Sequence, residues 1–71
     1  MDIVKLRETD EYIKLGQAMK LADMVSDGVE AKIAILNEEV RVNGEICTQR
    51  GKKLYKGDEF SYKDTAVKIG I

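Results

Sequence analysis

The spacing of apolar residues along the chain is helical in the first half and strand-like in the second. In the segment Tyr12–Met24, apolar residues recur about every three or four positions, which predicts an amphipathic helix. Thr9 is expected to cap this helix, because its side-chain oxygen can accept from a free backbone N–H group. The preceding segment Asp2–Arg7 alternates, which predicts a short strand with Val4 and Leu6 on one face.

A second helix is predicted for the segment Ser26–Asn37. Asp27 and Glu30 have the spacing of a capping box, which satisfies free N–H groups at a helix N-terminus. The six residues before Asn37 are apolar except for Lys32. We therefore expect this helix to be largely enclosed, with the ammonium group reaching water or an anion. Asn37 is expected to adopt the left-handed conformation that ends the helix.

The rest of the chain has the pattern of strands and turns. The pair Asn43-Gly44, between two alternating segments, is a strong hairpin signal. The order of elements predicts one α+β domain over residues 1–71, with a strand, two packed helices and then a small antiparallel sheet. The expected strands and turns are Val40–Val42, Asn43-Gly44, Glu45–Thr48, Lys56–Asp58, 59–62 and 66–69.

The composition fits a small soluble protein. Of the 71 residues, 44% are apolar and 35% are charged, which suits a globular domain with a modest core. No apolar run approaches the roughly 20 residues of a membrane span, and the acidic start lacks the basic residues of a secretory signal. The single cysteine, Cys47, cannot form an internal disulfide, so we expect a reducing, cytoplasmic location. A monomer is expected, since no amphipathic helix is left over for a second copy.

The residue types argue against catalysis and metal binding. The chain contains no histidine that could act as a general base, and Cys47 falls on a predicted strand without an activating partner. One cysteine and no histidine leave only carboxylates as metal ligands, and these lack the spacing of a calcium-binding loop. We therefore expect a non-enzymatic protein with no catalytic residue, metal or cofactor.

The charges are unevenly distributed, although their sum is only −1. Residues 1–30 carry a net charge of −3, residues 31–57 a net charge of +3, and residues 58–71 a net charge of −1. Residues 46–57, which include a predicted loop, contain four basic side chains and no acidic one. This distribution predicts a localised cationic patch that can bind a polyanion. A solvated, charged loop without a partner is the alternative interpretation.

Three short motifs follow one another along the chain. They are Glu30-Ala-Lys-Ile-Ala34, Val40-Arg-Val-Asn-Gly44 and Lys56-Gly-Asp58. Together they resemble the S4 RNA-binding domain, in particular the short stand-alone S4-like proteins of bacteria. The similarity extends from about Tyr12 to Tyr62, which leaves no room for a second, catalytic domain. It implies a small S4-like (αL) fold and non-catalytic binding of RNA.

The resemblance also implies which side chains contact RNA, because RNA lies against the two helices and the following hairpin in this family. Lysine and arginine suit such a surface, since they neutralise phosphates and arginine can hold a phosphate through two hydrogen bonds. Lys20 is interpreted equally well as plain helix surface. Lys32, Arg41, Arg50 and Lys52 are expected to converge on one face. The implied contacts are Lys14 on the first helix, Lys32 on the second, Arg41 on the hairpin, and Arg50, Lys52 and Lys53 in the loop.

The expected partner is structured RNA, and ribosomal RNA by family analogy. The aromatic residues are Tyr12, Tyr55, Phe60 and Tyr62. We interpret them mostly as core residues, which leaves no clearly exposed ring to stack on an unpaired base. The chain departs from the family pattern just before the hairpin, where Glu38-Glu39 stands in place of a common glycine. These carboxylates would weaken a phosphate site at Arg41 if they faced it.

Two rival functions use the same features differently. A protein-interaction module would use the cationic patch against an acidic partner. A sulfur-carrier or ubiquitin-like protein has a similar length and can contain a strand with the motif V-x-V-N-G. Its chemistry requires a free C-terminal Gly-Gly, whereas this chain ends Lys68-Ile-Gly-Ile71 and has two adjacent helices before the hairpin.

Overall fold

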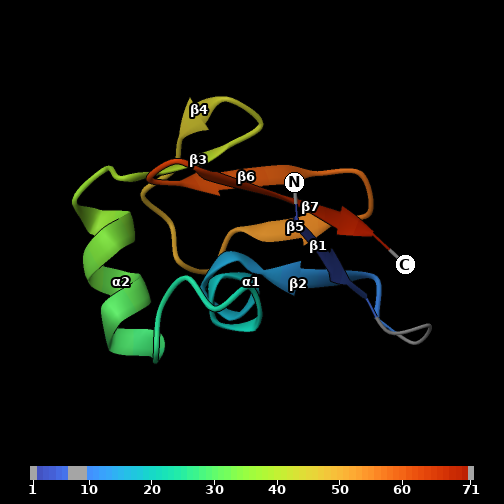
Figure 1. Cartoon of the computed structure of the whole chain (residues 1–71), viewed down its shortest axis with the longest axis horizontal. Coiled ribbons are helices and arrows are strands. Elements are labelled where there is room, and N and C mark those ends of the chain that lie inside the picture. Colours follow the sequence, from blue (N-terminus) through green and yellow to red (C-terminus); the bar gives the residue numbers. More distant parts are fainter. Residues whose placement is uncertain (1, 7–9, 71) are drawn as a thin grey trace.

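The computed structural model describes residues 2–6 and 10–70. Its elements are β1 (Asp2–Lys5), β2 (Tyr12–Lys14), α1 (Leu15–Leu21), α2 (Gly28–Leu36), β3 (Val40–Val42), β4 (Glu45–Ile46), β5 (Lys53–Tyr55), β6 (Glu59–Tyr62) and β7 (Thr65–Gly70). Five strands form one sheet in the order β1-β7-β6-β3-β4, and β2 pairs with β5 in a second, smaller sheet (Figure 1). The expected helix cap Thr9 lies outside the described residues.

The larger sheet is mixed rather than purely antiparallel. The strands β3, β4, β6 and β7 pair in antiparallel fashion, as expected for the second half of the chain. In contrast, β1 runs parallel to β7, with Val4 opposite Ile69. A parallel pair requires a long crossover, and here both helices and the hairpin lie between the two strands in the sequence. The α+β class is confirmed, and the direction of β1 corrects the expected sheet.

One hydrophobic core joins the two helices to the larger sheet and to β5. Val4 and Leu6 are buried in it, as their alternation predicts. Within the described parts of the chain, no helix is long and apolar enough to cross a membrane. The largest fully buried side chains are Phe60, Leu15, Met19, Ile35, Leu54, Ile69, Val40 and Val67.

The first helix is shorter than the sequence pattern predicts. It begins at Leu15, and the segment expected to form its first turn is the strand β2 instead. Pairing with β5 gives the backbone of this segment hydrogen-bond partners from a distant part of the chain, which overrides the local helical spacing. The helix ends at Leu21, shortly before Asp23 adopts a left-handed φ of 59°.

The N-terminus of α2 is capped largely as predicted. The carboxylate of Asp27 accepts from the Glu30 N–H group at 2.8 Å. The Glu30 carboxylate in turn accepts from the N–H group of Ser26 at 3.3 Å, rather than from that of Asp27. Two backbone donors that precede or begin the helix are therefore satisfied by side chains.

The C-terminus of α2 ends on a residue other than the expected one. Asn37 keeps a negative φ of −83°, and Glu38 adopts the left-handed conformation with a φ of 61°. The N–H groups of Glu38 and Glu39 donate to the carbonyl groups of Ile35 and Ala34, at 3.1 and 3.2 Å. This is the Schellman arrangement, in which glycine usually occupies the left-handed position.

The second helix is also less enclosed than expected. Ala31, Ala34 and Ile35 are buried, but the side chains of Val29, Ile33 and Leu36 are 66%, 56% and 57% exposed. A surface helix contributes one stripe to the core, and a chain of this length has too few elements to cover its other side. The apolar run therefore forms both a core stripe and an exposed apolar stripe.

The hairpin turn and the later Lys56–Asp58 turn are joined directly. Asn43 and Gly44 have φ values of 51° and 86°, as the predicted two-residue hairpin requires. The Asn43 side-chain amide donates to the Asp58 carboxylate at 3.2 Å, and its oxygen accepts from the Glu59 N–H group at 3.0 Å. The second and third sequence motifs are therefore bonded to each other, and together they stabilise the same part of the fold.

Replacing Glu38 with glycine is expected to stabilise the protein. A left-handed conformation costs an L-residue about 1–2 kcal/mol, and glycine loses part of that advantage through about 0.5–1 kcal/mol of backbone entropy. Chemical denaturation of Glu38→Gly should therefore show a free energy of unfolding higher by roughly 0.5–1 kcal/mol. The matched control Glu39→Gly should destabilise, and equal effects of the two variants would contradict the assignment.

Removing the Asn43 side chain is expected to destabilise the protein. The two lost hydrogen bonds contribute about 0.5–1.5 kcal/mol each, so Asn43→Ala should lower the free energy of unfolding by about 1–3 kcal/mol. Asn37→Ala, at an exposed asparagine, is the control and should change it much less. Strictly additive effects of Asn43→Ala and Asp58→Ala in a double-mutant cycle would show that the two side chains are not coupled.

Candidate nucleic-acid interface

All the basic residues that the sequence indicates are exposed, so each can reach a ligand. They do not, however, all lie on one face of the domain. Two line a single groove, two lie beside that groove, and two lie on the hairpin side. The residues are Lys14, Lys32, Arg41, Arg50, Lys52 and Lys53.

A groove of about 290 Å³ lies where the start of α1, the start of α2 and the loop before β5 meet. Its cationic side chains are those of Lys14, Lys20 and Arg50, and Gln17 adds an amide group. Among the described residues that line it, none is acidic. We refer to it as the basic groove. Two of the predicted contacts, Lys14 and Arg50, are thus brought together from segments distant in the sequence.

The approach of Arg50 to the groove depends on backbone contacts with α1. The N–H group of Leu15 donates to the carbonyl of Lys52 at 2.9 Å, and that of Gly16 donates to the carbonyl of Arg50 at 3.2 Å. The first N–H groups of a helix lack partners within the helix, and the loop supplies them here. A Cβ atom at Gly16 would lie 2.9 Å from Cγ of Arg50, so the Arg50 side chain passes directly over this glycine.

Lys20 joins the groove although its sequence position alone did not distinguish it from plain helix surface. Lys14, Gln17 and Lys20 follow one another at intervals of three, which places their side chains along one side of α1. This three-residue spacing is the sequence feature that could have indicated that Lys20 lies beside Lys14. Lys14 itself is the last residue of β2 and precedes α1, rather than lying on the helix as expected.

Lys53 lies next to the groove through the pairing of β2 with β5. The register places Lys14 opposite Lys53 and Tyr12 opposite Tyr55. The alternate residue Leu54 is fully buried, so these four side chains project from the other side of the small sheet. We call this the β2–β5 outer face. Two like charges opposite each other are unfavourable, and the ammonium group of Lys53 lies over the Tyr12 ring, 4.8 Å from its centroid.

The aromatic residues are less buried than the sequence analysis expected. Phe60 is in the core, as predicted. Tyr55 is 47% exposed, and Tyr12 and Tyr62 are half-buried. The interpretation of Tyr55 as a core residue is therefore wrong. Its neighbour Leu54 takes the inward position on β5, and in a strand the next side chain must point the other way.

Lys32 lies close to the basic groove but outside its lining. It follows Gly28, a lining residue, by four positions on α2, so it projects from the same side of the helix one turn further on. Glu38 and Glu39 follow the opposite end of α2, beyond a helix length of roughly 12 Å. These carboxylates therefore do not line the groove.

Arg41 points away from the side of the sheet that the helices cover. Its neighbours Val40 and Val42 are buried, so Arg41 projects from the opposite face of β3. Its guanidinium group donates to the carbonyl of Gly44 at 3.3 Å, within the hairpin. Lys52 lines a separate hollow beside that hairpin. The predicted convergence of Lys32, Arg41, Arg50 and Lys52 on one face is therefore wrong for Arg41.

The comparison with family models gives one match that covers nearly the whole chain. The S4 domain model matches residues 4–70. The chain belongs to the S4 domain family. One relative is the "Probable ribosome maturation protein RlbA" of Bacillus subtilis (strain 168), which is 50% identical over 48 residues. These residues are 68% of this chain and 68% of the relative.

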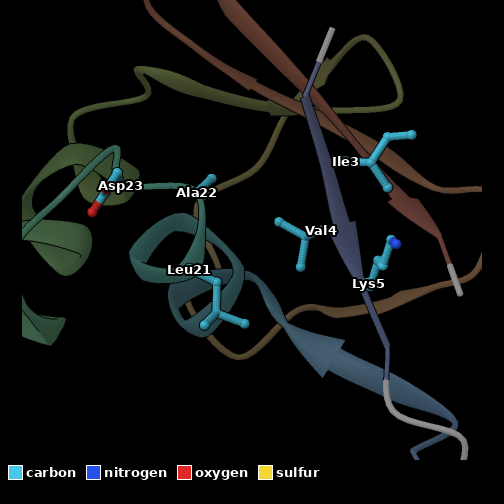
Figure 2. Close-up of a pocket in the computed structure, with 6 residues that line it drawn as sticks. All are labelled: Ile3, Val4, Lys5, Leu21, Ala22 and Asp23. Carbon is cyan, nitrogen blue, oxygen red and sulfur yellow. The ribbon is translucent and has the colours of Figure 1, made fainter.

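Another hollow of the S4 domain, about 450 Å³ in volume, lies between β1 and the end of α1. Figure 2 shows Val4 pointing from β1 towards α1, with Ile3 and Lys5 on the other side of the strand. Its charged residues are Lys5 and Asp23, one of each sign, so it lacks the uniform charge of the basic groove. Across the described residues, no group of acidic, cysteine or histidine side chains could hold a metal ion.

Replacing Gly16 with alanine is expected to disturb Arg50 and thereby destabilise the S4 domain. Alanine normally stabilises a helix relative to glycine by about 0.5–1 kcal/mol, but overpacking costs roughly 1–3 kcal/mol. Gly16→Ala should therefore lower the free energy of unfolding by about 1 kcal/mol. In the Arg50→Ala background, which lacks the Cγ atom, the same change should be neutral or stabilising.

Gly28→Ala is the matched control, because no atom lies within 4 Å of the position its Cβ would take. It should be neutral or mildly stabilising. If Gly16→Ala is equally destabilising with and without the Arg50 side chain, their contact is not the cause.

Proposed function

We propose that this S4 domain binds RNA without catalysing a reaction, and that it acts in ribosome maturation on ribosomal RNA. The observation that carries the proposal is the basic groove, whose three cationic side chains come from the end of β2, from α1 and from the loop before β5. The family and the relative's printed role in ribosome maturation support the choice of RNA as the polyanion. Such a role corresponds to a cytoplasmic location.

The chemistry of the groove suits phosphate groups. Lysine and arginine neutralise phosphates and release bound counterions, which provides most of the affinity of sequence-independent RNA binding. The guanidinium group of Arg50 can also hold one phosphate through two hydrogen bonds.

The neighbouring lysines extend the proposed surface on two sides. Lys53 on the β2–β5 outer face and Lys32 on α2 each border the basic groove. Lys52 lies nearer the hairpin, and Arg41 is on the other face of the sheet. We therefore expect Lys14, Lys20 and Arg50 to contribute most, and Arg41 to contribute only where RNA reaches the hairpin.

A salt titration of RNA binding tests this proposal. Four or five neutralised phosphates imply that the logarithm of the affinity falls with the logarithm of salt concentration at a slope of about −3 to −4. Lys14→Gln and Arg50→Gln should each reduce the slope by about one unit, and should weaken unrelated stem-loops by similar factors. Melting temperatures should hardly change, since exposed charged residues alter stability by only about 0.5 kcal/mol.

The control variant is Lys68→Gln, because Lys68 is exposed on β7 between the buried residues Val67 and Ile69 and so lies on the sheet face away from the groove. Equal losses for Lys14→Gln and Lys68→Gln would indicate a diffuse charge effect rather than a site. Failure of the unmodified protein to bind any stem-loop of ribosomal RNA at low salt would favour the rival function, an interaction with an acidic protein.

A further inference from the structure

The β2–β5 outer face combines two aromatic rings with two ammonium groups. Tyr12 and Tyr55 are cross-strand neighbours, and their ring centroids lie 5.9 Å apart at an interplanar angle of 54°. Lys14 and Lys53 form the next cross-strand pair. Lys14 also lines the basic groove. Lys14 therefore belongs both to the basic groove and to this face.

Tyr55 offers the more accessible of the two rings. The ammonium group of Lys53 occupies one face of Tyr12, whereas Tyr55 is 47% exposed. The backbone at Tyr55 is held in place, because its N–H group donates to the Asp58 carboxylate at 2.7 Å and the preceding Leu54 is fully buried. A ring held on a fixed backbone loses little entropy when it binds a flat ligand.

Exposed aromatic rings beside cationic side chains are the usual means of binding unpaired nucleotides. The ring stacks on a base, and the cations contact the phosphates on either side. Stacking is tolerant of sequence because every base has an aromatic face. A fully paired RNA helix presents no free base face except at its ends, so such a ring distinguishes paired from unpaired RNA.

We propose that Tyr55, supported by Tyr12, stacks on an unpaired base, while Lys14 and Lys53 contact its flanking phosphates. The preferred RNA is then a stem in the basic groove joined to an unpaired nucleotide on the β2–β5 outer face. This inference rests on the proposed RNA-binding function and specifies the class of RNA. It refines the expectation of a structured RNA, which rested on interpreting the tyrosines mostly as core residues.

The competing explanation is that the tyrosines only stabilise the small sheet. Cross-strand aromatic pairs do stabilise short antiparallel strands. That role would lower the melting temperature of a Tyr55 variant, but it would affect the binding of paired and unpaired RNA equally. A comparison of two RNAs therefore separates the two roles.

The experiment uses two RNAs with the same stem, one blunt-ended and one with a short unpaired extension that contains the fluorescent base 2-aminopurine. The unmodified protein should bind the extended RNA roughly 5- to 100-fold more tightly than the blunt one, which is the range expected for stacking of one base. Binding should also quench the 2-aminopurine emission. Tyr55→Leu should lose both effects and bind the blunt RNA as before, whereas Tyr55→Phe should keep both.

The charge contribution has its own matched pair of variants. Lys53 lies over Tyr12, and Lys63 lies over Tyr62, 5.2 Å from its ring centroid, on the turn between β6 and β7. Lys53→Gln should reduce the salt slope for the extended RNA by about one unit. Lys63→Gln removes the same kind of ammonium–ring contact elsewhere and should leave the slope unchanged. Melting curves for all variants verify that each is folded at the assay temperature.

Several results would overturn the inference. Equal affinity of the unmodified protein for both RNAs, or equal losses for both in Tyr55→Leu, would refute stacking while leaving RNA binding by the groove in place. A Tyr55→Phe variant as weak as Tyr55→Leu would indicate that the hydroxyl group matters rather than the ring face. Absence of binding to either RNA at low salt would refute the proposed function itself, and the inference with it.

Discussion

The carboxylate of Asp58 forms hydrogen bonds to both sheets of this S4 domain. It accepts from the N–H group of Tyr55, the last residue of the small sheet, and from the side-chain amide of Asn43 in the hairpin of the large sheet. The backbone of the same turn bonds to β7, with Gly57 donating to Ile69 and Ile69 donating to Asp58, at 2.9 and 2.8 Å. One turn therefore fixes the end of β5, the hairpin and a central strand at once, and the placement of Tyr55 follows from it.

The parts of the fold that the sequence predicts well are those determined by near neighbours. The Asn43-Gly44 turn requires two left-handed residues in succession, and the cap at Asp27 requires only a partner three residues away. The parts that it predicts poorly depend on distant partners. Residues 12–14 have helical spacing, yet they form a strand because β5 is available to pair with them. The exposed stripe on α2 likewise depends on how few elements remain to cover it.

The same distinction between near and distant partners applies to the candidate site. Basic residues can be recognised from the sequence because charged side chains are seldom buried, and all the predicted ones are exposed. Which of them lie close together in the fold cannot be predicted from their positions in the sequence. Lys14 and Arg50 meet because the loop before β5 bonds to the first turn of α1, and Arg41 is turned away because its neighbours on β3 are buried. Tyr55 was misassigned for a similar reason, since the inward position belongs to Leu54.

A protein with a net charge of −1 binds a polyanion best where its few cations lie close together, as in the basic groove. Two of those cations, Lys14 and Lys20, also line a neighbouring hollow that includes Asp10 and Glu11. Screening at physiological salt limits electrostatic attraction to about 8 Å, so the acids beyond the far end of α2 have little effect on the basic groove. Screening also weakens the phosphate contacts themselves, and binding that depends on them alone typically has a dissociation constant of roughly 10⁻⁴ to 10⁻⁶ M. Base stacking involves no release of counterions, so its contribution is retained at salt concentrations that weaken the phosphate contacts. The proposed stacking on Tyr55 would therefore retain affinity that the proposed phosphate contacts lose at physiological salt.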